Sequence, residues 1–155
     1  MDFVKDTFDI CGLTQTFIFV NTLSFAETLH TKLRKDGLSS YIMFSKMSAQ
    51  ERDDTMKKFR EQEINVLITT NLIARGIDVP EADLVINYDV PTVRENGSFK
   101  GDLESYQHRV GRCGRFGQPG VAVTLWDRES DKECLDQIIS QYQNNMKIEE
   151  LKDKD

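Results

Sequence analysis

The segment QHRVGRCGRFG at residues 107–117 places Arg109, Arg112 and Arg115 three residues apart, with glycines between them. A guanidinium group matches two phosphate oxygens at once, so such a row is suited to binding phosphate. Residues three apart on a helix lie on neighbouring azimuths, so the three side chains are expected to share a side. Glycine costs a helix about 1 kcal/mol relative to alanine, and it is tolerated where another backbone or a ligand comes close. The alternative is a solvated basic face, or pairing with a nearby acid such as Glu104.

A second segment with groups suited to phosphate is TTNLIARGIDV at residues 69–79. Its threonines end an apolar run that predicts a strand, so the Thr70 hydroxyl and nearby backbone N–H groups are available to phosphate oxygens. The Asp78 carboxylate is suited to accept a hydrogen bond from a ribose hydroxyl. The alternative is that Thr70 caps a short helix and Asp78 is a turn residue.

The composition restricts the class of protein. Of the 155 residues, 39% are hydrophobic and 30% are charged, which fits one soluble globular domain. The net charge is −6, whereas proteins that bind nucleic acid over much of their surface are normally basic. The phosphate contacts of this chain should therefore be few and local. No apolar run reaches the roughly 18 residues of a membrane helix, and the first residues show no secretory pattern, so no membrane insertion is expected.

The cysteines give a further restriction. Cys11, Cys113 and Cys134 are odd in number and far apart in the sequence. This spacing predicts neither a disulfide framework nor a zinc site, and it favours a reducing compartment.

Short apolar runs alternate with helical patterns along the chain. Strands are predicted at 16–21, 39–44, 65–70, 83–88 and 121–126, and helices at 24–36, 48–60, 103–112 and 129–142. Ser48 and Glu51 form a capping-box pattern at the start of the second helix. The alternation predicts an α/β fold with a parallel sheet of about five to six strands and helices on both faces. Residues 91–102 are expected to be a long loop, and ligands are expected beyond the carboxyl ends of the strands.

Three segments, in order along the chain, resemble motifs of a known family. FVNT at 19–22, ARGID at 74–78 and HRVGRCGR at 108–115 resemble motifs IV, V and VI of the DEAD-box RNA helicases. The resemblance extends from Thr16 to about Tyr142 and is nearest to the mRNA-export, nuclear-pore-associated branch. It implies the C-terminal RecA-like lobe of a two-lobed ATPase. The implied boundaries are 1–15 for a short lead-in, 16–146 for the lobe and 147–155 for a charged, flexible tail.

The resemblance also implies roles in ATP binding. The P-loop and the Asp-Glu-Ala-Asp box belong to the first lobe and are absent from this sequence, so ATP with Mg would be bound mainly by that lobe. Arg112 and Arg115 would reach the γ-phosphate, with Arg115 as the arginine finger, and Asp78 would bind the ribose. His108 and Arg109 would position the motif and link it to the other lobe. The isolated chain is therefore expected to be essentially inactive as an ATPase.

Five residues are implied to bind the sugar-phosphate backbone of single-stranded RNA: Asn21, Thr22, Arg52, Thr70 and Gly76. Lys46 is expected to add a phosphate contact of its own, from a turn in which the sequence departs from the family. The sequence departs from the family at 44–46, where Phe-Ser-Lys replaces a His-Gly-Asp type of turn, and at Ala49, where glutamine is usual. The changed turn leaves a second interpretation open, a catalytically degenerate module that docks RNA or protein.

The expected activity of the whole protein is ATP-driven unwinding of RNA or remodelling of RNA–protein complexes, as in mRNA export. Its implied partners are RNA, the N-terminal RecA-like lobe, and a nuclear-pore export activator with inositol hexakisphosphate. A monomer is expected, in the cytoplasm and nucleus and at the nuclear pore.

Overall fold

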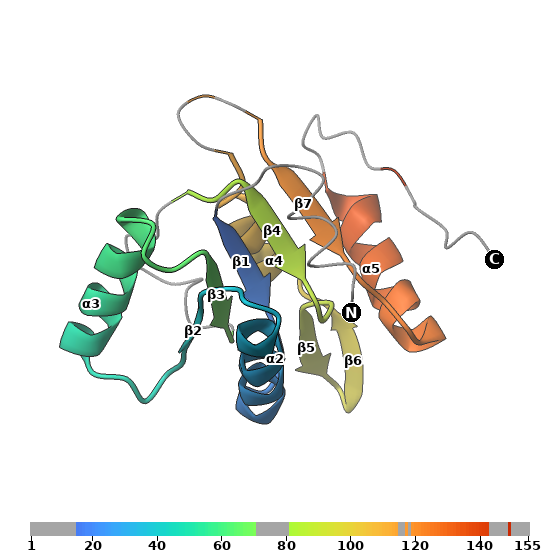
Figure 1. The fold of residues 1–155 in the computed structure, drawn as a ribbon. Coiled ribbons are helices and arrows are strands. Elements are labelled where there is room, and N and C mark those ends of the chain that lie inside the picture. The colour runs from blue at the N-terminus through green and yellow to red at the C-terminus, as the bar shows by residue number, and fades with distance from the viewer. Residues whose placement is uncertain (1–14, 71–80, 115–116, 118, 143–148, 150–155) are drawn as a thin grey trace.

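The computed structural model describes residues 15–70, 81–114, 117, 119–142 and 149. They build a five-stranded parallel sheet in the order β2-β3-β1-β4-β7 (Figure 1). The strands are β1 (Thr16–Phe19), β2 (Ser40–Met43), β3 (Val66–Thr69), β4 (Leu84–Asn87) and β7 (Val121–Thr124). The predicted parallel α/β sheet is confirmed.

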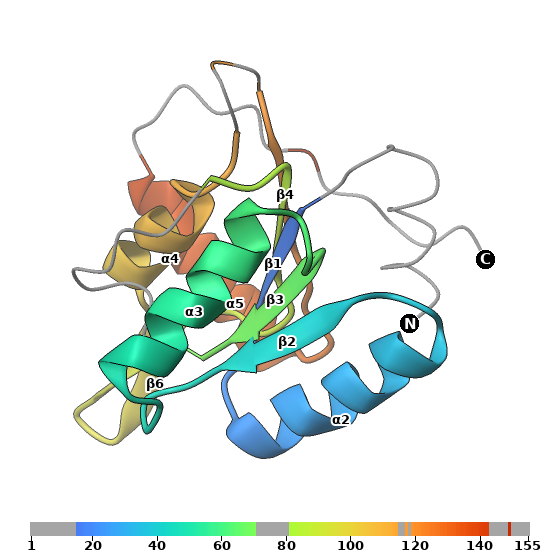
Figure 2. The same cartoon turned by 60° about the vertical axis from the view of Figure 1, so that its left-hand side comes forward.

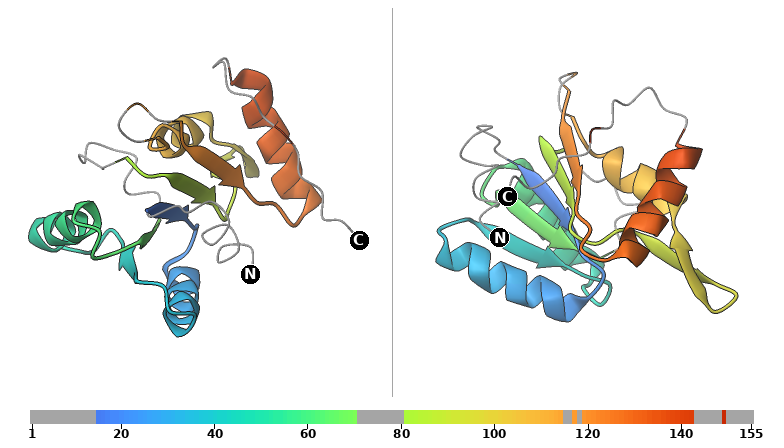
Figure 3. Two further views of the ribbon diagram at one scale, coloured as in Figure 1. Left: turned by 45° about the horizontal axis from the view of Figure 1, so that its top comes forward. Right: turned by 90° about the vertical axis from the view of Figure 1, so that its right-hand side faces the viewer.

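Helices cover both faces of this sheet, as predicted. The four helices among the described residues are α2 (Leu23–Lys35), α3 (Ala49–Arg60), α4 (Leu103–Val110) and α5 (Glu129–Gln141). Ala26, Leu29 and Leu33 of α2 pack on one face, against residues such as Ile18 and Ile68. Figure 3 (left) shows α2 below the sheet and α4 above it. In the described part of the chain, no helix is both long and apolar enough to cross a membrane.

On the opposite face, α3 buries Met56 and Phe59 against β1 and β3. The rings of Phe17 and Phe59 have their centroids 4.9 Å apart. The central strands β1, β3 and β4 are buried along their whole lengths, because both of their faces are covered. This rigid centre fixes the positions of the segments that leave the two ends of the strands.

The segment predicted as a long loop is instead a β-hairpin, formed by β5 (Thr92–Glu95) and β6 (Ser98–Gly101). Asn96 and Gly97 connect the strands, with φ values of 50° and 83°. Two residues with positive φ make the turn whose twist matches an antiparallel pair, and Asn-Gly is its commonest sequence. The hairpin projects from the sheet beneath α5 (Figure 3, right). At its base, a Cβ on Gly101 would lie 2.2 Å from the Cys134 carbonyl oxygen, so glycine permits the contact with α5.

The predicted lead-in and tail lie outside the described residues, apart from Gln15 and Glu149. The domain boundaries given by the sequence therefore stay predictions.

Candidate functional site

Five of the residues predicted to bind RNA lie at the carboxyl ends of three neighbouring strands. Asn21 and Thr22 follow β1, Lys46 follows β2, and Thr70 follows β3. Arg52 lies in α3 just after the turn that leaves β2 (Figure 2). We call these five residues the carboxyl-edge set. Its members come from distant parts of the sequence, and the parallel sheet brings them to one side of the molecule.

Two helices begin at this edge. Thr22 is the N-cap of α2, and its Oγ1 accepts a hydrogen bond from the Phe25 N–H at 3.3 Å. The first turn of α2 contains no acidic residue, so its N-terminus keeps a positive potential suited to a phosphate. The predicted capping box of α3 is confirmed, because Ser48 and Glu51 exchange hydrogen bonds of 3.2 Å and 2.7 Å. The carboxylate of Glu51 thus already interacts with the N-terminus of α3. The half-buried cation Arg52 is the next residue along this helix.

Asp89, just beyond β4, holds the first residue of the carboxyl-edge set. Its Oδ2 accepts a hydrogen bond from the Asn21 backbone N–H at 2.6 Å. The short distance fits a bond to an ionised acceptor. Asp89 therefore fixes the backbone where the chain leaves β1, and it places a negative charge beside the carboxyl-edge set.

Arg109 is the buried cation of the site, and its side chain is only 1% exposed. Its Nη1 donates to Asn87 Oδ1 at 3.3 Å and to the Asp89 carbonyl oxygen at 3.0 Å. The guanidinium carbon lies 5.0 Å from the centre of the Phe19 ring, a cation–π contact. Burial lowers the pKa of Arg109 to about 10, and the charges of Asp89 and Asp102 oppose that shift. Arg109 therefore ties α4 to the carboxyl ends of β1 and β4.

Arg112 lies at the other end of the sheet. Its carbonyl oxygen accepts from the Ala82 N–H at 2.9 Å, and Gly114 N–H donates to the Ala82 carbonyl at 2.9 Å. Ala82 precedes β4, so this short parallel bridge is at the amino ends of the strands. The Arg112 side chain is half-buried and forms no ion pair with a carboxylate among the described residues.

The prediction that the arginines share one side of a helix is wrong for Arg109 and Arg112. Helix α4 ends at Val110, with Gly111 as its C-cap, so Arg112 lies beyond the helix. Arg109 points into the core, where Asn87 Oδ1 and the Asp89 carbonyl oxygen accept its hydrogen bonds. The alternative was a pairing of an arginine with Glu104. Glu104 instead lies 3.7 Å from His108 Nε2, on the exposed side of α4.

The glycines of the arginine row allow a tight backbone path. Gly114 has a φ of 107°, a conformation that side chains with a Cβ rarely adopt. Gly120 packs against it, since a Cβ on Gly120 would lie 2.3 Å from the Gly114 nitrogen and 2.6 Å from Cys113 Sγ. Burial raises the pKa of Cys113 to about 11, so its thiol is protonated at neutral pH. The path of the segment after Arg112 thus depends on close backbone contact.

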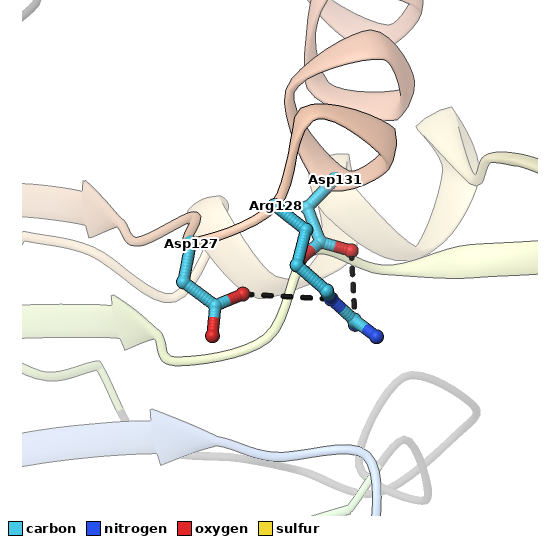
Figure 4. A network of polar contacts seen from close by, with 3 residues as sticks. All are labelled: Asp127, Arg128 and Asp131. Carbon is cyan, nitrogen blue, oxygen red and sulfur yellow. Dashed lines mark hydrogen bonds and ion pairs between the residues drawn. The ribbon is translucent and has the colours of Figure 1, made fainter.

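A cation that the sequence analysis did not single out, Arg128, lies after β7, at the carboxyl end of the sheet. Its guanidinium donates to both carboxylate oxygens of Asp131, at 3.1 Å and 3.2 Å, and Asp127 is 3.5 Å away (Figure 4). These hydrogen bonds and charges raise its pKa. The carboxylates of Asp127 and Asp131 therefore already pair with this guanidinium. Within the described residues, no group of three or more His, Cys, Asp or Glu side chains could hold a metal ion.

Sequence reasoning missed Asn87 and Asp89 as parts of the site. Asn87 is fully buried in β4, and its Nδ2 donates to Thr124 Oγ1 at 3.1 Å. A polar residue inside the apolar run DLVINY was the available signal, because a buried amide needs partners. The remaining predicted residues, Gly76, Asp78 and Arg115, lie outside the described residues.

A five-stranded parallel sheet in the order β2-β3-β1-β4-β7, with helices on both faces, is the architecture of a RecA-like domain. Residues 6–117 match the family described as "Helicase conserved C-terminal domain". The chain belongs to this family, and its relatives identify it as the C-terminal RecA-like domain of the DEAD-box type.

Two relatives illustrate the similarity in sequence. The ATP-dependent RNA helicase eIF4A of Saccharomyces cerevisiae (strain YJM789) is 42% identical over 148 residues, which cover 96% of this chain and 34% of that protein. The ATP-dependent RNA helicase DBP5 of Kluyveromyces lactis is 39% identical over 135 residues, covering 87% of this chain and 28% of that protein. The chain thus spans about a third of the length of the curated relatives that it matches.

Solved structures agree with this assignment. The C-terminal domain of the DEAD-box protein Dbp5 has a TM-score of 0.77 and 38% identity, over 90% of this chain and 77% of that one. S. cerevisiae Dbp5 bound to RNA and ADP BeF3 gives a TM-score of 0.76 with 38% identity, over 90% of this chain and 35% of that one. A variant of the same protein bound to a Gle1 variant and IP6 gives a TM-score of 0.79 with 38% identity, over the same shares of the two chains.

Proposed function

We propose that this chain supplies half of the active site of an ATP-dependent RNA helicase, whose N-terminal lobe carries the P-loop and binds most of ATP and Mg. Arg112 and Arg115 contact the γ-phosphate when the lobes close, with Arg115 as the arginine finger, and Asp78 binds the ribose. His108 and Arg109 position this segment. Closure sequesters the reaction and bends the bound RNA, and hydrolysis reopens the cleft.

The observation that carries this proposal is the position of Arg112. It is the half-buried member of the arginine row, at the amino end of β4, without a carboxylate partner among the described residues. A guanidinium held by a tight backbone path, and paired with no carboxylate of the described residues, is preorganised for an anion supplied from outside the chain. The missing lobe, with its bound nucleotide, would supply that anion.

The carboxyl-edge set, with Gly76, is proposed to bind the backbone of single-stranded RNA. Its chemistry is one amide, two hydroxyls and two cations beside the acid-free N-terminus of α2. Such groups contact phosphate and sugar and carry no direct information about base sequence. ATP and RNA would then bind at opposite ends of one rigid sheet, with α4 running between them.

The test is ATP turnover with single-stranded RNA, using a protein in which this chain is joined to its own N-terminal lobe. Arg115→Ala is expected to lower kcat about a thousandfold or more, as arginine fingers do in phosphoryl transfer. Arg94→Ala, an exposed arginine on the β5–β6 hairpin, serves as the matched control and should leave turnover unchanged. Unchanged turnover in Arg115→Ala would remove the finger role.

The same assay separates the enzyme from a degenerate docking module. The module predicts RNA binding without RNA-stimulated ATP turnover, even when an intact N-terminal lobe is present. Turnover by the wild-type two-lobed protein contradicts the module. Robust hydrolysis by the isolated chain would contradict the proposed division of the active site between two lobes.

We also propose a role in mRNA export, with a cytoplasmic and nuclear distribution that includes the nuclear pore. Its support is the similarity to Dbp5, which has been solved with Gle1 and IP6, although the eIF4A relatives are as similar in sequence. In this role a pore-associated activator with inositol hexakisphosphate docks on a basic surface of the monomeric lobe. A pull-down of the activator with and without the inositol phosphate tests this, and identical recovery in both would contradict it.

A further inference from the structure

Helices α2 and α3 cover opposite faces of the sheet, and both end before the strands β2 and β3 that follow them (Figure 2). The last turns of the two helices contribute six cations, which we call the basic corner: Lys32, Arg34, Lys35, Lys57, Lys58 and Arg60. Three acids lie among them: Asp36, Glu61 and Glu63. Six cations against three acids leave a local surplus of three positive charges, in a chain whose net charge is −6. Basic residues in a last turn interact favourably with the helix dipole, and both helices here carry three of them.

Two members of the basic corner line an open hollow of about 500 Å³. Arg34 lines it from α2 and Lys58 from α3, and the apolar part of its wall includes Leu38, Tyr41 and Ile64. Tyr41 is 43% exposed, which is unusual for a large side chain in a strand of this sheet. The hollow therefore combines two cations with an accessible aromatic surface.

The two cations in the hollow form no ion pair with a carboxylate in the described parts of the chain. Other exposed lysines do, since Lys57 pairs with Glu61 at 3.9 Å and Lys132 with Asp136 at 2.8 Å. Arg34 also lowers the pKa of the nearby His30, after the larger effect of burial. The lining of the hollow thus carries two cations against one acid, Glu63.

Strand β2 borders the same hollow and is an edge strand of the sheet. No described strand pairs with its outer edge, so backbone N–H and C=O groups there are available to an added strand. An extended peptide binds such an edge through main-chain hydrogen bonds, and pockets beside the edge select its side chains. Tyr41 pairs in register with Leu67, which packs with Phe59 of α3, so the Tyr41 ring faces the side of the sheet that carries Lys58.

We propose that the basic corner and the β2 edge form a docking surface for an acidic peptide segment of a partner protein. Acidic side chains pair with Arg34 and Lys58, and an apolar side chain of the peptide packs on Tyr41 and Leu38. Charge complementarity favours an acidic partner. The RNA-binding residues proposed above are at the opposite end of the sheet, which places a bound RNA backbone away from this hollow.

The experiment measures binding of a fluorescent synthetic peptide of aspartate, glutamate and serine with two phenylalanines to the 155-residue chain, by anisotropy. A second peptide replaces each acid by its amide. The acidic peptide is expected to bind, and the amide peptide at least about tenfold more weakly. The double variant Arg34→Glu/Lys58→Glu should lose at least about tenfold in affinity for the acidic peptide, and Tyr41→Ala should weaken it as well.

The matched control is Arg94→Glu/Lys100→Glu, which reverses the charge of two exposed cations on the β5–β6 hairpin, outside the lining of the hollow. It should leave peptide affinity unchanged, and circular dichroism should show that every variant is folded. Single-stranded RNA and inositol hexakisphosphate are added as competitors. The proposal is overturned if the acidic peptide does not bind, if both double variants lose affinity equally, or if RNA or the inositol phosphate binds the corner in preference to the peptide.

Discussion

Arg109 and Asn87 meet inside the protein, where Nη1 of the arginine donates to Oδ1 of the asparagine at 3.3 Å. The asparagine amide also donates to Thr124 Oγ1, so one side chain joins α4, β4 and β7. Burying the charge of a residue that is only 1% exposed lowers the stability of the fold unless polar groups form hydrogen bonds with it. The sequence repeats Arg at 109 and 112, yet the first is part of the core and the second is half-buried beyond the end of α4.

The first prediction concerns this buried arginine. Arg109→Met keeps much of the side-chain volume but leaves Asn87 Oδ1 and the Asp89 carbonyl without their donor. We expect a loss of about 2–4 kcal/mol in the free energy of unfolding, because buried acceptors lose hydrogen bonds to a charged group. Urea denaturation followed by circular dichroism measures it.

Arg94→Met, on the exposed hairpin, is the matched control and should change stability by less than about 0.5 kcal/mol. If Arg109→Met is as stable as this control, the hydrogen bonds of Arg109 do not hold α4 to the sheet.

The general architecture was accessible from sequence because β1, β3 and β4 are continuous apolar runs and the helices carry apolar faces. The capping box at Ser48 was also readable, since both of its partners lie within one turn. The hairpin was missed, although Asn96 and Gly97 are its commonest turn sequence, because its strands are largely exposed and polar and show no apolar alternation.

The candidate site was only partly accessible from sequence, for a different reason. The contact of Asp89 with Asn21 joins residues 68 positions apart, and no local pattern encodes it. The expectation that ligands lie beyond carboxyl ends suits the carboxyl-edge set, but Arg112 lies at the amino end, because α4 returns the chain across the sheet before the arginine row ends.

The second prediction tests the tight backbone path after Arg112. In Gly120→Ala, the new Cβ would meet the Gly114 nitrogen at 2.3 Å and Cys113 Sγ at 2.6 Å, so the backbone must move. We expect a loss of about 1–3 kcal/mol, as in overpacked interiors. Thermal unfolding measures it, and Val121→Thr, an exposed neighbour of similar size, should stay within about 0.5 kcal/mol of wild type. Equal stability of the two variants would mean that this contact is looser than the structure has it.

The third prediction is a pH dependence that arises from His30. Its Nδ1 lies 2.9 Å from Ser40 Oγ, and burial, followed by the charge of Arg34, lowers its pKa from the ordinary 6.5. The unfolded state therefore takes up a proton at a higher pH than the folded state. The stability from neutral His30 is complete above about pH 6.5 and is lost as the pH falls through the lowered folded pKa.

Urea denaturation between pH 7.5 and pH 5 checks this dependence. His30→Gln, which cannot titrate, should show a shallower loss of stability over that range than wild type. His108→Gln is the matched control, because it removes the other histidine of the chain. In this variant the free energy of unfolding should depend on pH as in the wild type. If both variants follow the wild-type curve, His30 is not the group responsible.

The last prediction separates two effects that Asp89 could have on RNA binding. Its carboxylate fixes the Asn21 backbone, but its charge also lies beside residues proposed to bind phosphate. If repulsion dominates, removing the charge tightens RNA binding; if positioning dominates, removing the acceptor weakens it. The bond of 2.6 Å between Asp89 Oδ2 and Asn21 N is short and charge-assisted, so we expect positioning to dominate.

In the two-lobed protein with an ATP analogue, Asp89→Ala should therefore weaken binding of single-stranded RNA about tenfold, by fluorescence anisotropy. Asp89→Asn, which keeps an acceptor oxygen, should weaken it less, although it removes the same charge. Tighter binding by both variants would show that Asp89 acts through its charge alone, because only the repulsion account predicts that removing the carboxylate helps the RNA.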